Sequence, residues 1–239
     1  MKFLRKSWLR KLSPSYSELQ KMNAKLDVLL DLLDPGRFHR NGERQVAASL
    51  DMIRPDHLGR YRFAAARISS GEQVLDMACG IGYGSYLLAQ ESPADRIVAV
   101  DIEPQAIEYG RLHYQNERID FVCGDAIDVE LPAGLFDTVV SFETIEHLPQ
   151  PERLLQRFQT LLRPGGRLIC STPNQAAMPF DKEKFPFHLQ HFTEAQMREM
   201  LGTAGFQVNE VHSQYEKKSA SVVQDGNGKY LIFVATHLG

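Results

Sequence analysis

Short apolar runs alternate with helix-like segments along most of this 239-residue chain, and this alternation restricts the fold more than any other feature. Short apolar strands that are joined by helices form βαβ units, whose strands pair into a mostly parallel sheet that is covered on both faces. The strand-like runs lie at 73–78, 96–101, 119–124, 136–142 and 166–172. The helix-like segments lie at about 57–68, 83–90, 104–115 and 151–162.

Two further strand-like runs, 205–214 and 229–236, flank the turn residues Asp225-Gly226-Asn227-Gly228 near the end of the chain. A turn rich in Asp, Asn and Gly between two such runs is typical of an antiparallel hairpin. The sequence therefore predicts an α/β fold with a Rossmann-like, doubly wound sheet of about seven strands. We expect this sheet to be mostly parallel, with a C-terminal antiparallel hairpin strand, and to be preceded by N-terminal helices.

The N-terminal residues follow a different pattern from the rest of the chain. Residues 1–12 place Leu4, Trp8 and Leu12 on one helical face and carry five basic side chains and no acid. Residues 16–33 repeat apolar side chains at spacings of three and four, which predicts a second amphipathic helix. We expect residues 1–36 to form a helical appendage and residues 37–239 to form the main domain.

The formal net charge of −3 is unevenly distributed, because residues 13–239 hold 22 basic and 30 acidic side chains. An acidic main domain argues against nucleic acid as a partner, since domains that wrap a nucleic-acid backbone usually carry a positive field. The basic segment 1–12 favours weak contact with an anionic membrane surface. The two N-terminal helices suit either pairing between subunits, which would give a homodimer, or packing on the main domain.

The cysteines and the hydropathy pattern indicate the compartment. Cys79, Cys123 and Cys170 are far apart, which fits neither a disulfide framework nor a thiolate zinc site. No apolar run approaches the roughly 20 residues that are needed to cross a bilayer, and basic residues interrupt the N-terminus where a secretory signal would be apolar. We expect a reduced, cytoplasmic protein, peripheral at most to the inner face of the membrane.

A glycine-rich turn follows the first strand of the main domain. The segment 76–84 reads DMACGIGYG, and its glycines allow positive φ and close approach of a ligand to the backbone at the start of a helix. Asp101 ends the next strand, where a carboxylate can accept both hydroxyls of a ribose. Asp125 follows the third strand and is suited to receive an adenine amino group. An NAD-binding domain remains an alternative, although its turn normally has G-x-G-x-x-G spacing rather than the G-x-G-x-G found here.

In order and spacing, these residues resemble the class I S-adenosylmethionine-dependent methyltransferases over about residues 57–236. The resemblance implies that S-adenosyl-L-methionine is the cofactor. It assigns Asp101 with Ile102 to the ribose and Asp125 with Ala126 to the adenine. The other cofactor-binding residues that it implies are Asp76, Ala78, Gly80, Gly82, Tyr83, Gly84 and Phe142.

The segment Glu143-Thr144-Ile145-Glu146-His147 follows the fourth strand. Ligands of open α/β sheets bind beyond the carboxyl ends of the strands, so we expect Glu143, Glu146 and His147 to face the reacting methyl group. Two carboxylates and an imidazole suit a divalent cation such as Mg²⁺ or Mn²⁺. The pattern E-x-x-E-H is similar to that of ubiquinone-pathway O-methyltransferases and of small-RNA 2′-O-methyltransferases. In the latter a further histidine, matched here by His188, completes the metal site, although the tryptophan of that segment is absent.

Without a metal, we expect His147 to accept the proton of an attacking hydroxyl as a general base. His191 is expected to be a helix-entry or rim residue rather than a ligand. A sugar hydroxyl is a poor nucleophile at neutral pH and needs a base or a metal, whereas an amine needs this help less.

The acceptor is indicated by segments outside the glycine turn. The segments 42–44, 55–61, 171–174 and 187–188 are similar to those of a bacterial methyltransferase subgroup associated with surface polysaccharide or sugar modification. This resemblance implies O-methylation of a sugar or glycan hydroxyl in polysaccharide biosynthesis. Arg60 and Tyr61 are predicted to bind the cofactor carboxylate or to close the pocket. Residues 174–190, which lack periodicity, are predicted to form a lid or an acceptor wall.

Three other functions stay open at this point. The first is O- or N-methylation of a quinone or another natural product. The second is RNA terminal 2′-O-methylation, which His188 favours and the acidic main domain opposes. The third is a cofactor-binding regulatory or assembly protein that has lost its chemistry, against which the intact acids and glycines of the cofactor motifs argue.

Overall fold

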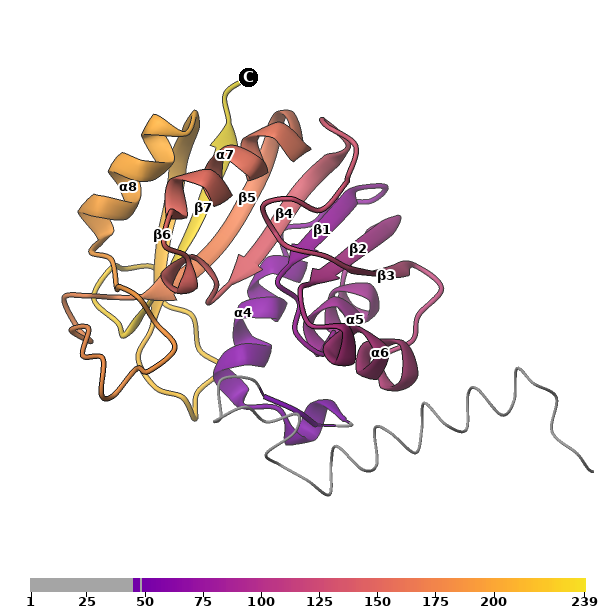
Figure 1. Cartoon of the computed structure of the whole chain (residues 1–239), viewed down its shortest axis with the longest axis horizontal. Helices are drawn as coiled ribbons and strands as arrows, with labels where there is room; N and C mark the ends of the chain where they lie inside the picture. The colour runs from indigo at the N-terminus through magenta and orange to yellow at the C-terminus, as the bar shows by residue number, and fades with distance from the viewer. Residues whose placement is uncertain (1–44, 48) are drawn as a thin grey trace, which may run out of the picture. The chain divides into compact units, whose positions relative to one another are not determined.

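Seven strands form one sheet in the order β3-β2-β1-β4-β5-β7-β6 in a computed structural model, which describes residues 45–47 and 49–239 (Figure 1). Strands β1 to β5 are parallel to their neighbours in this group, and β7 is antiparallel to both β5 and β6. The predicted mostly parallel sheet with an antiparallel C-terminal strand is therefore confirmed. The strands are β1 (Gln73–Met77), β2 (Arg96–Asp101), β3 (Ile119–Cys123), β4 (Phe136–Phe142), β5 (Leu162–Pro173), β6 (Phe206–Gln214) and β7 (Tyr230–His237).

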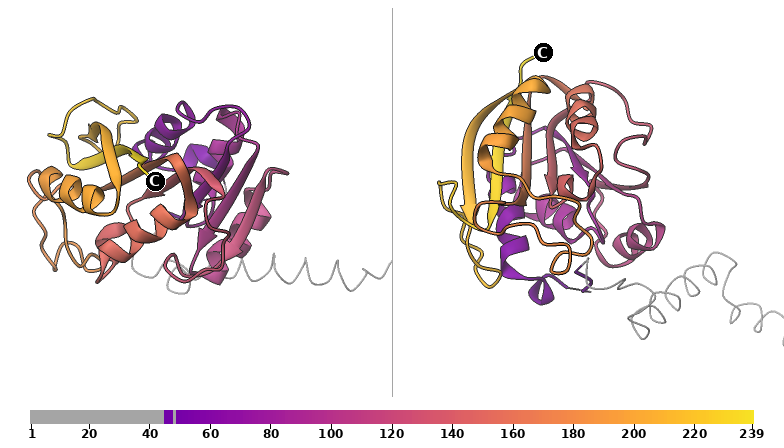
Figure 2. Two further views of the ribbon diagram at one scale, coloured as in Figure 1. Left: turned by 90° about the horizontal axis from the view of Figure 1, so that it is seen from above. Right: turned by 60° about the vertical axis from the view of Figure 1, so that its left-hand side comes forward.

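Helices cover both faces of the sheet, with α4, α5 and α6 on one side and α7 and α8 on the other (Figure 2). The central strand β4 is buried along its whole length, as a strand between two helical layers must be. A contiguous apolar core joins α7 and α8 to the sheet through Leu155, Phe158 and Leu201. The helices are α4 (Pro55–Ala65), α5 (Tyr83–Glu91), α6 (Pro104–His113), α7 (Pro151–Leu161) and α8 (Glu194–Thr203).

Local sequence signals set several of the helix ends. Pro55, Pro104 and Pro151 each occupy the first helical position, where the missing N–H has no intrahelical partner to lose. A capping box starts α8, because the Thr193 hydroxyl accepts the Gln196 N–H and the Gln196 side chain accepts the Thr193 N–H. These helices therefore begin where backbone donors are either absent or satisfied.

The structure differs from the predicted elements at three places. Helix α4 begins at Pro55, two residues before the predicted start, and β5 begins at Leu162 rather than at 166. Helix α8 was not predicted, because it buries only Met197 and Leu201 and has little apolar periodicity. The predicted hairpin strands 205–214 and 229–236 agree with β6 and β7 to within one residue, and residues 215–229 connect them.

The predicted appendage, residues 1–36, and the segment 42–44 lie outside the described residues. The boundary at residue 36, the membrane contact through residues 1–12 and the homodimer therefore stay predictions, as does the cytoplasmic location. Among the described residues, no helix combines the length and the apolar character that a membrane span requires.

The β6–β7 connection packs directly on helix α4 at Gly59. A methyl group at Gly59 would lie 2.2 Å from the carbonyl oxygen of Ala220, so that only glycine allows this approach. Gly202 in α8 has no such neighbour within 4 Å. The two helical glycines therefore differ in their tertiary role, although helix propensity alone favours alanine at both.

We expect Gly59→Ala to lower the free energy of unfolding by about 1–3 kcal/mol, because the backbone of the connection must move away. The matched control Gly202→Ala should raise it by about 0.5–1 kcal/mol, as alanine normally does inside a helix. Urea denaturation of both variants measures these changes. A stabilising Gly59→Ala would contradict the close packing of the connection on α4.

Candidate functional site

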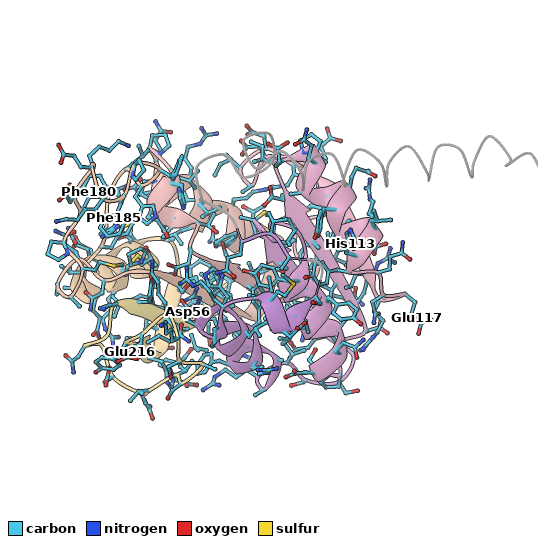
Figure 3. The ribbon with its side chains drawn as sticks, turned by 90° about the horizontal axis from the view of Figure 1, so that it is seen from below. Asp56, His113, Glu117, Phe180, Phe185 and Glu216 are labelled. Atoms are coloured by element: carbon cyan, nitrogen blue, oxygen red, sulfur yellow. The ribbon has the colours of Figure 1, made fainter. Side chains whose placement is uncertain are left out.

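The candidate site lies at the carboxyl ends of the parallel strands, which Figure 3 shows from below the view of Figure 1. Strand β1 pairs with β2 on one side and with β4 on the other, so the order of the strands reverses between β1 and β4. Ligands of open α/β sheets bind at such a switch point. The glycine turn after β1 and the Glu143–His147 segment after β4 flank this point.

The three glycines of the turn play two different parts. Gly80 has a φ of +59°, and a side chain placed there would meet no atom within 4 Å. A methyl group at Gly82 would lie 2.4 Å from the Phe121 ring, and one at Gly84 would lie 1.9 Å from the Tyr61 ring. Gly80 therefore leaves the backbone open to a ligand, whereas Gly82 and Gly84 allow aromatic rings to pack against the turn.

Asp101 joins the glycine turn to the end of β2. One oxygen of its buried carboxylate accepts the Gly80 N–H at 2.8 Å, and the other accepts the Glu103 N–H at 2.9 Å. Each carboxylate oxygen has a further lone pair, so Asp101 can still accept the hydroxyls of a ribose. The neighbouring Ile102 side chain is 58% exposed and offers an apolar surface beside that carboxylate.

At the predicted adenine site, Asp125 and Ala126 make local and core contacts. The Asp125 side chain is exposed, and its Oδ1 atom accepts the Ile127 N–H at 2.8 Å within its own turn. Ala126 packs partly buried against the core. The contact of these two residues with an adenine ring stays a prediction.

Asp76 lies beneath the glycine turn and is fully buried. Its carboxylate accepts hydrogen bonds from the Ser85 hydroxyl at 2.6 Å and from the Tyr61 hydroxyl at 3.2 Å. Burial raises the pKa of Asp76 to about 7, although the two hydroxyl donors oppose this effect. Asp76 thus positions Tyr61 over the turn, and its own charge is poorly stabilised.

Three predicted cofactor residues form an aromatic group above this turn. The Tyr61 ring stands edge-on to the Phe142 ring at 5.0 Å and to the Tyr83 ring at 5.7 Å. His57, which was not predicted, accepts or donates a hydrogen bond at 2.7 Å between its Nδ1 atom and the Tyr83 hydroxyl. No spacing signal marks His57 in the sequence, because its relation to Tyr83 arises only when α4 packs on α5.

Arg60 is buried and has partners on two C-terminal strands. Its guanidinium donates to the Gln214 side chain at 2.8 Å, lies 3.8 Å from the Asp56 carboxylate and stacks over the Tyr230 ring. These contacts fasten α4 to β6 and β7. The predicted contact of Arg60 with a cofactor carboxylate is not tested by them and stays a prediction.

The segment after β4 turns through a short 3-10 helix, η2 (Ile145–His147). Glu143 adopts a left-handed φ of +52°, which is uncommon for a residue with a side chain. Its Oε1 atom accepts the Ser171 hydroxyl at 2.6 Å, so Glu143 is held against the end of β5.

Glu146 is fully buried, and only one of its carboxylate oxygens has a protein partner. The Oε2 atom accepts the Thr172 hydroxyl at 3.1 Å, whereas the Oε1 atom has no hydrogen-bond partner. Burial, and then the charge of Glu143, raise the pKa of Glu146 well above its ordinary value. A buried acceptor without a donor is costly, and a proton or a bound cation would relieve that cost.

A chain of hydrogen bonds determines which nitrogen of His188 carries a lone pair. The His191 Nδ1 atom lies 2.7 Å from the Met178 carbonyl oxygen and must donate to it, so the His191 Nε2 atom is an acceptor. The His188 Nδ1 atom lies 2.7 Å from that Nε2 atom and therefore donates. The lone pair of His188 is consequently on Nε2, and His191 is the residue that fixes this tautomer.

His147 is oriented in the same manner. Its Nδ1 atom lies 3.1 Å from the Phe187 carbonyl oxygen, so that Nδ1 carries the proton and Nε2 the lone pair. Carbonyl-oriented imidazoles of this kind are usual among metal-binding histidines. Burial, together with neighbouring histidines and lysines, lowers the pKa of His188 to about 4 and keeps this ring neutral near pH 7.

The structure brings three of the four predicted metal ligands together. Glu146, His147 and His188 each offer one ligand atom, and these atoms lie within 4.8 Å of one another. Glu143 does not belong to this group. One carboxylate and two imidazoles have the chemistry to hold a divalent cation, which could contact the unpartnered Oε1 atom of Glu146.

Comparison with known proteins identifies a family. Residues 52–211, about two thirds of the chain, match the family described as "Methyltransferase domain". A probable S-adenosylmethionine-dependent methyltransferase of Mycolicibacterium smegmatis is 34% identical over 143 residues, which cover 59% of this chain and 54% of that protein. A ubiquinone biosynthesis O-methyltransferase of Xylella fastidiosa is 32% identical over 150 residues, which cover 61% of this chain and 57% of that protein. The chain thus spans about half the length of the curated relatives it matches.

Solved structures share the fold at lower sequence identity. An S-adenosylmethionine-dependent methyltransferase of Mesorhizobium loti has a TM-score of 0.62 at 16% identity, covering 74% of this chain and 97% of its own. A putative methyltransferase in complex with the Haloferax volcanii Trm112 activator has a TM-score of 0.66 at 20% identity, covering 77% of this chain and 91% of its own. The Rossmann-like fold predicted from the sequence is therefore shared with solved methyltransferases.

Replacing Asp76 should remove a pH dependence of stability. A carboxyl whose pKa is raised in the folded state loses stability as the pH increases from its unfolded value, near 4, to its folded value, about 7. Between pH 5 and pH 8 we expect the stability of Asp76→Asn to improve relative to the wild type by about 2–3 kcal/mol. Urea denaturation of both proteins at the two pH values measures this difference. The exposed Asp128→Asn should show no such change, and an equal result for the two variants would contradict the assignment.

Proposed function

Since this chain belongs to the methyltransferase-domain family, we propose that it transfers the methyl group of S-adenosylmethionine to a hydroxyl of a small-molecule acceptor. The observation that carries the proposal is the Glu146–His147–His188 group at the switch point of the sheet. A hydroxyl must lose its proton to become a good nucleophile near neutral pH. This group can assist that loss, either by binding a cation or by accepting the proton. An amine would have no comparable need of it.

The described residues fit the cofactor at the ends of β1 and β2. The open backbone at Gly80 admits a ligand to the glycine turn, and we assign the ribose to the Asp101 carboxylate beside it. The exposed Ile102 provides an apolar surface for the attached base. When bound there, S-adenosylmethionine supplies an electrophilic methyl group on its sulfonium sulfur, and the protein has to orient the acceptor and exclude water.

In this proposal, the residues after β4 assist removal of the proton from the acceptor. In the version that we propose first, Glu146, His147 and His188 hold a divalent cation, which would lower the pKa of a hydroxyl that it binds. Two imidazoles and one carboxylate suit Mn²⁺ or Zn²⁺ better than Mg²⁺, which prefers oxygen ligands. In the alternative version no cation is bound, and the Nε2 atom of His147 accepts the hydroxyl proton directly.

Two classes of acceptor are candidates for this reaction. The sugar or glycan hydroxyl rests on the sequence resemblance of the segments around Arg60, Asn174 and His188. The second class is a small molecule of the quinone type, because the chain is similar to a ubiquinone biosynthesis O-methyltransferase. In the 174–192 segment, Phe185 stacks on His188 and Phe180 packs edge-on against His191, and such aromatic side chains can pack against either kind of ring.

Loss of the Asp101 carboxylate should weaken cofactor binding. Asp101→Ala removes hydrogen bonds to a charged group, each worth about 1.5–3 kcal/mol, so the affinity for S-adenosylhomocysteine should fall by at least roughly tenfold. Isothermal titration calorimetry measures this change. The control Asp120→Ala removes an exposed carboxylate that pairs with Arg96 on the sheet edge, and it should leave the affinity unchanged. No binding to the wild type would refute the proposed cofactor.

Removal of divalent cations should abolish methyl transfer to a hydroxyl acceptor, and added Mn²⁺ should restore it. Calorimetry should show that Mn²⁺ binds the wild type and binds Glu146→Gln more weakly, because that change removes the anionic ligand from the group. If EDTA leaves the activity intact while His147→Ala loses about 10²–10⁴-fold, His147 is the general base and the cation version is wrong.

A further inference from the structure

His191 is a buried histidine whose two ring nitrogens both have protein partners. Its Nδ1 atom lies 2.7 Å from the Met178 carbonyl oxygen, and its Nε2 atom lies 2.7 Å from the Nδ1 atom of His188. The Phe185 ring stands edge-on to the His191 ring at 4.6 Å between centroids and restricts its rotation. His191 therefore links a backbone carbonyl to a histidine that we assign to the cation site.

The Met178 carbonyl oxygen belongs to a turn that is fastened to the neighbour of His191. The Met178 N–H donates to the Asn174 carbonyl oxygen at 2.7 Å, and the Gln175 N–H donates to the Phe192 carbonyl oxygen at 2.9 Å. Phe192 is the next residue after His191, so the turn and the histidine are held together by the backbone as well as by the side chain. The Nδ1 proton of His191 thus has a fixed hydrogen-bond acceptor.

The bond to His191 decides where the ring proton of His188 lies. Burial lowers the pKa of both histidines, so both rings are neutral near pH 7 and each carries one proton. Because the proton of His191 is on Nδ1 and donates to Met178, its Nε2 atom can only accept. His188 must therefore place its proton on Nδ1, and its Nε2 atom keeps a lone pair.

The same bond explains why a buried oxygen of Glu146 has no donor. The Glu146 Oε1 atom lacks a hydrogen-bond partner, although a ligand atom of Glu146 and one of His188 lie within 4.8 Å of each other. A proton on the Nε2 atom of His188 would offer that carboxylate a nearby donor and would prevent this nitrogen from binding a cation. With the proton held on Nδ1, both groups stay unprotonated, as coordination of a metal ion requires.

We propose that His191 is a positioning residue of the cation site: it keeps the proton of His188 on Nδ1, so that the Nε2 atom and the Glu146 carboxylate can bind a divalent cation together. The inference rests on the proposed function. His191 is not itself a ligand, because both of its ring nitrogens are engaged. Loss of an outer partner of this kind typically lowers the affinity for a metal by about 10–100-fold.

The tautomer of His188 can be measured without a cation. In two-bond ¹H–¹⁵N correlation spectra of the metal-free full chain, we expect a protonated Nδ1 atom for His188, whose signals are assigned by their loss in His188→Gln. His191→Phe keeps a buried ring but removes the hydrogen-bond acceptor, so it should shift the proton towards Nε2. His191→Gln can accept from His188 and donate to Met178, so it should preserve the Nδ1 form. A wild-type His188 with its proton on Nε2 would overturn the inference.

Isothermal titration calorimetry with Mn²⁺ measures the consequence for binding. We expect His191→Phe to weaken Mn²⁺ binding by about 10–100-fold and His191→Gln to stay within about threefold of the wild type. The control His212→Phe replaces a histidine of the same 6% exposure, whose ring bonds to Glu210, and it should bind Mn²⁺ as the wild type does. Equal affinities of the wild type and His191→Phe, or equal losses in the two His191 variants, would contradict the role of His191.

Binding of S-adenosylhomocysteine, measured on the same samples, verifies folding and should be equal in all of these variants. A wild type that binds no Mn²⁺ refutes the cation version of the proposed function, and the inference with it. A wild type that binds Mn²⁺ no more tightly than His191→Phe refutes the inference alone, so the two failures are distinguishable.

Discussion

The whole site depends on how the glycine turn is tied to the neighbouring strand. The Cys79 N–H donates to the Val100 carbonyl oxygen at 2.8 Å, and the Gly80 N–H donates to the Asp101 carboxylate at 2.8 Å. These two bonds hold the end of β1 against the end of β2 while the backbone passes through positive φ. Because the turn is fixed in this way, α5 starts at Tyr83 and the Tyr61 ring finds room above Gly84.

A second set of bonds assembles the acceptor side from segments that are distant in sequence. The Asn174 side chain donates to the carbonyl oxygens of Gly226 and Gly228, so it holds the start of the 174–192 segment to the end of the β6–β7 connection. The Leu189 N–H donates to the Glu146 carbonyl oxygen at 2.9 Å. Backbone bonds therefore bring the histidine-bearing segment over the carboxylates, and the side chains meet as a result.

Both halves of the site keep a buried carboxyl group whose charge is poorly stabilised. Asp76 under the glycine turn and Glu146 after β4 have raised pKa values, chiefly because of burial. In the absence of a ligand, an apolar residue at either position would make the folded protein more stable. Both buried carboxyl groups therefore lower the stability of the free protein at neutral pH.

The sequence was sufficient to predict the sheet, because short apolar strands between amphipathic helices have few other ways to bury their side chains. It was also sufficient to place Asp76, Asp101 and Glu143 at one edge of the sheet, since parallel strands bring their carboxyl ends together whatever the packing above them. Helix α8 escaped prediction because only two of its side chains face the core. His57 and Ser85 escaped it because no fixed spacing relates them to Tyr83 and Asp76.

The sequence by itself thus determined the layers of the fold and the family motifs at one edge of its sheet. Only the tertiary structure decided which candidate ligands meet: it grouped Glu146 with His147 and His188, held Glu143 against Ser171 and made His191 the residue that sets the His188 tautomer. The reason is physical. Strand and helix patterns follow from local burial, whereas the distance between side chains on separate loops depends on backbone hydrogen bonds that leave no pattern in the sequence.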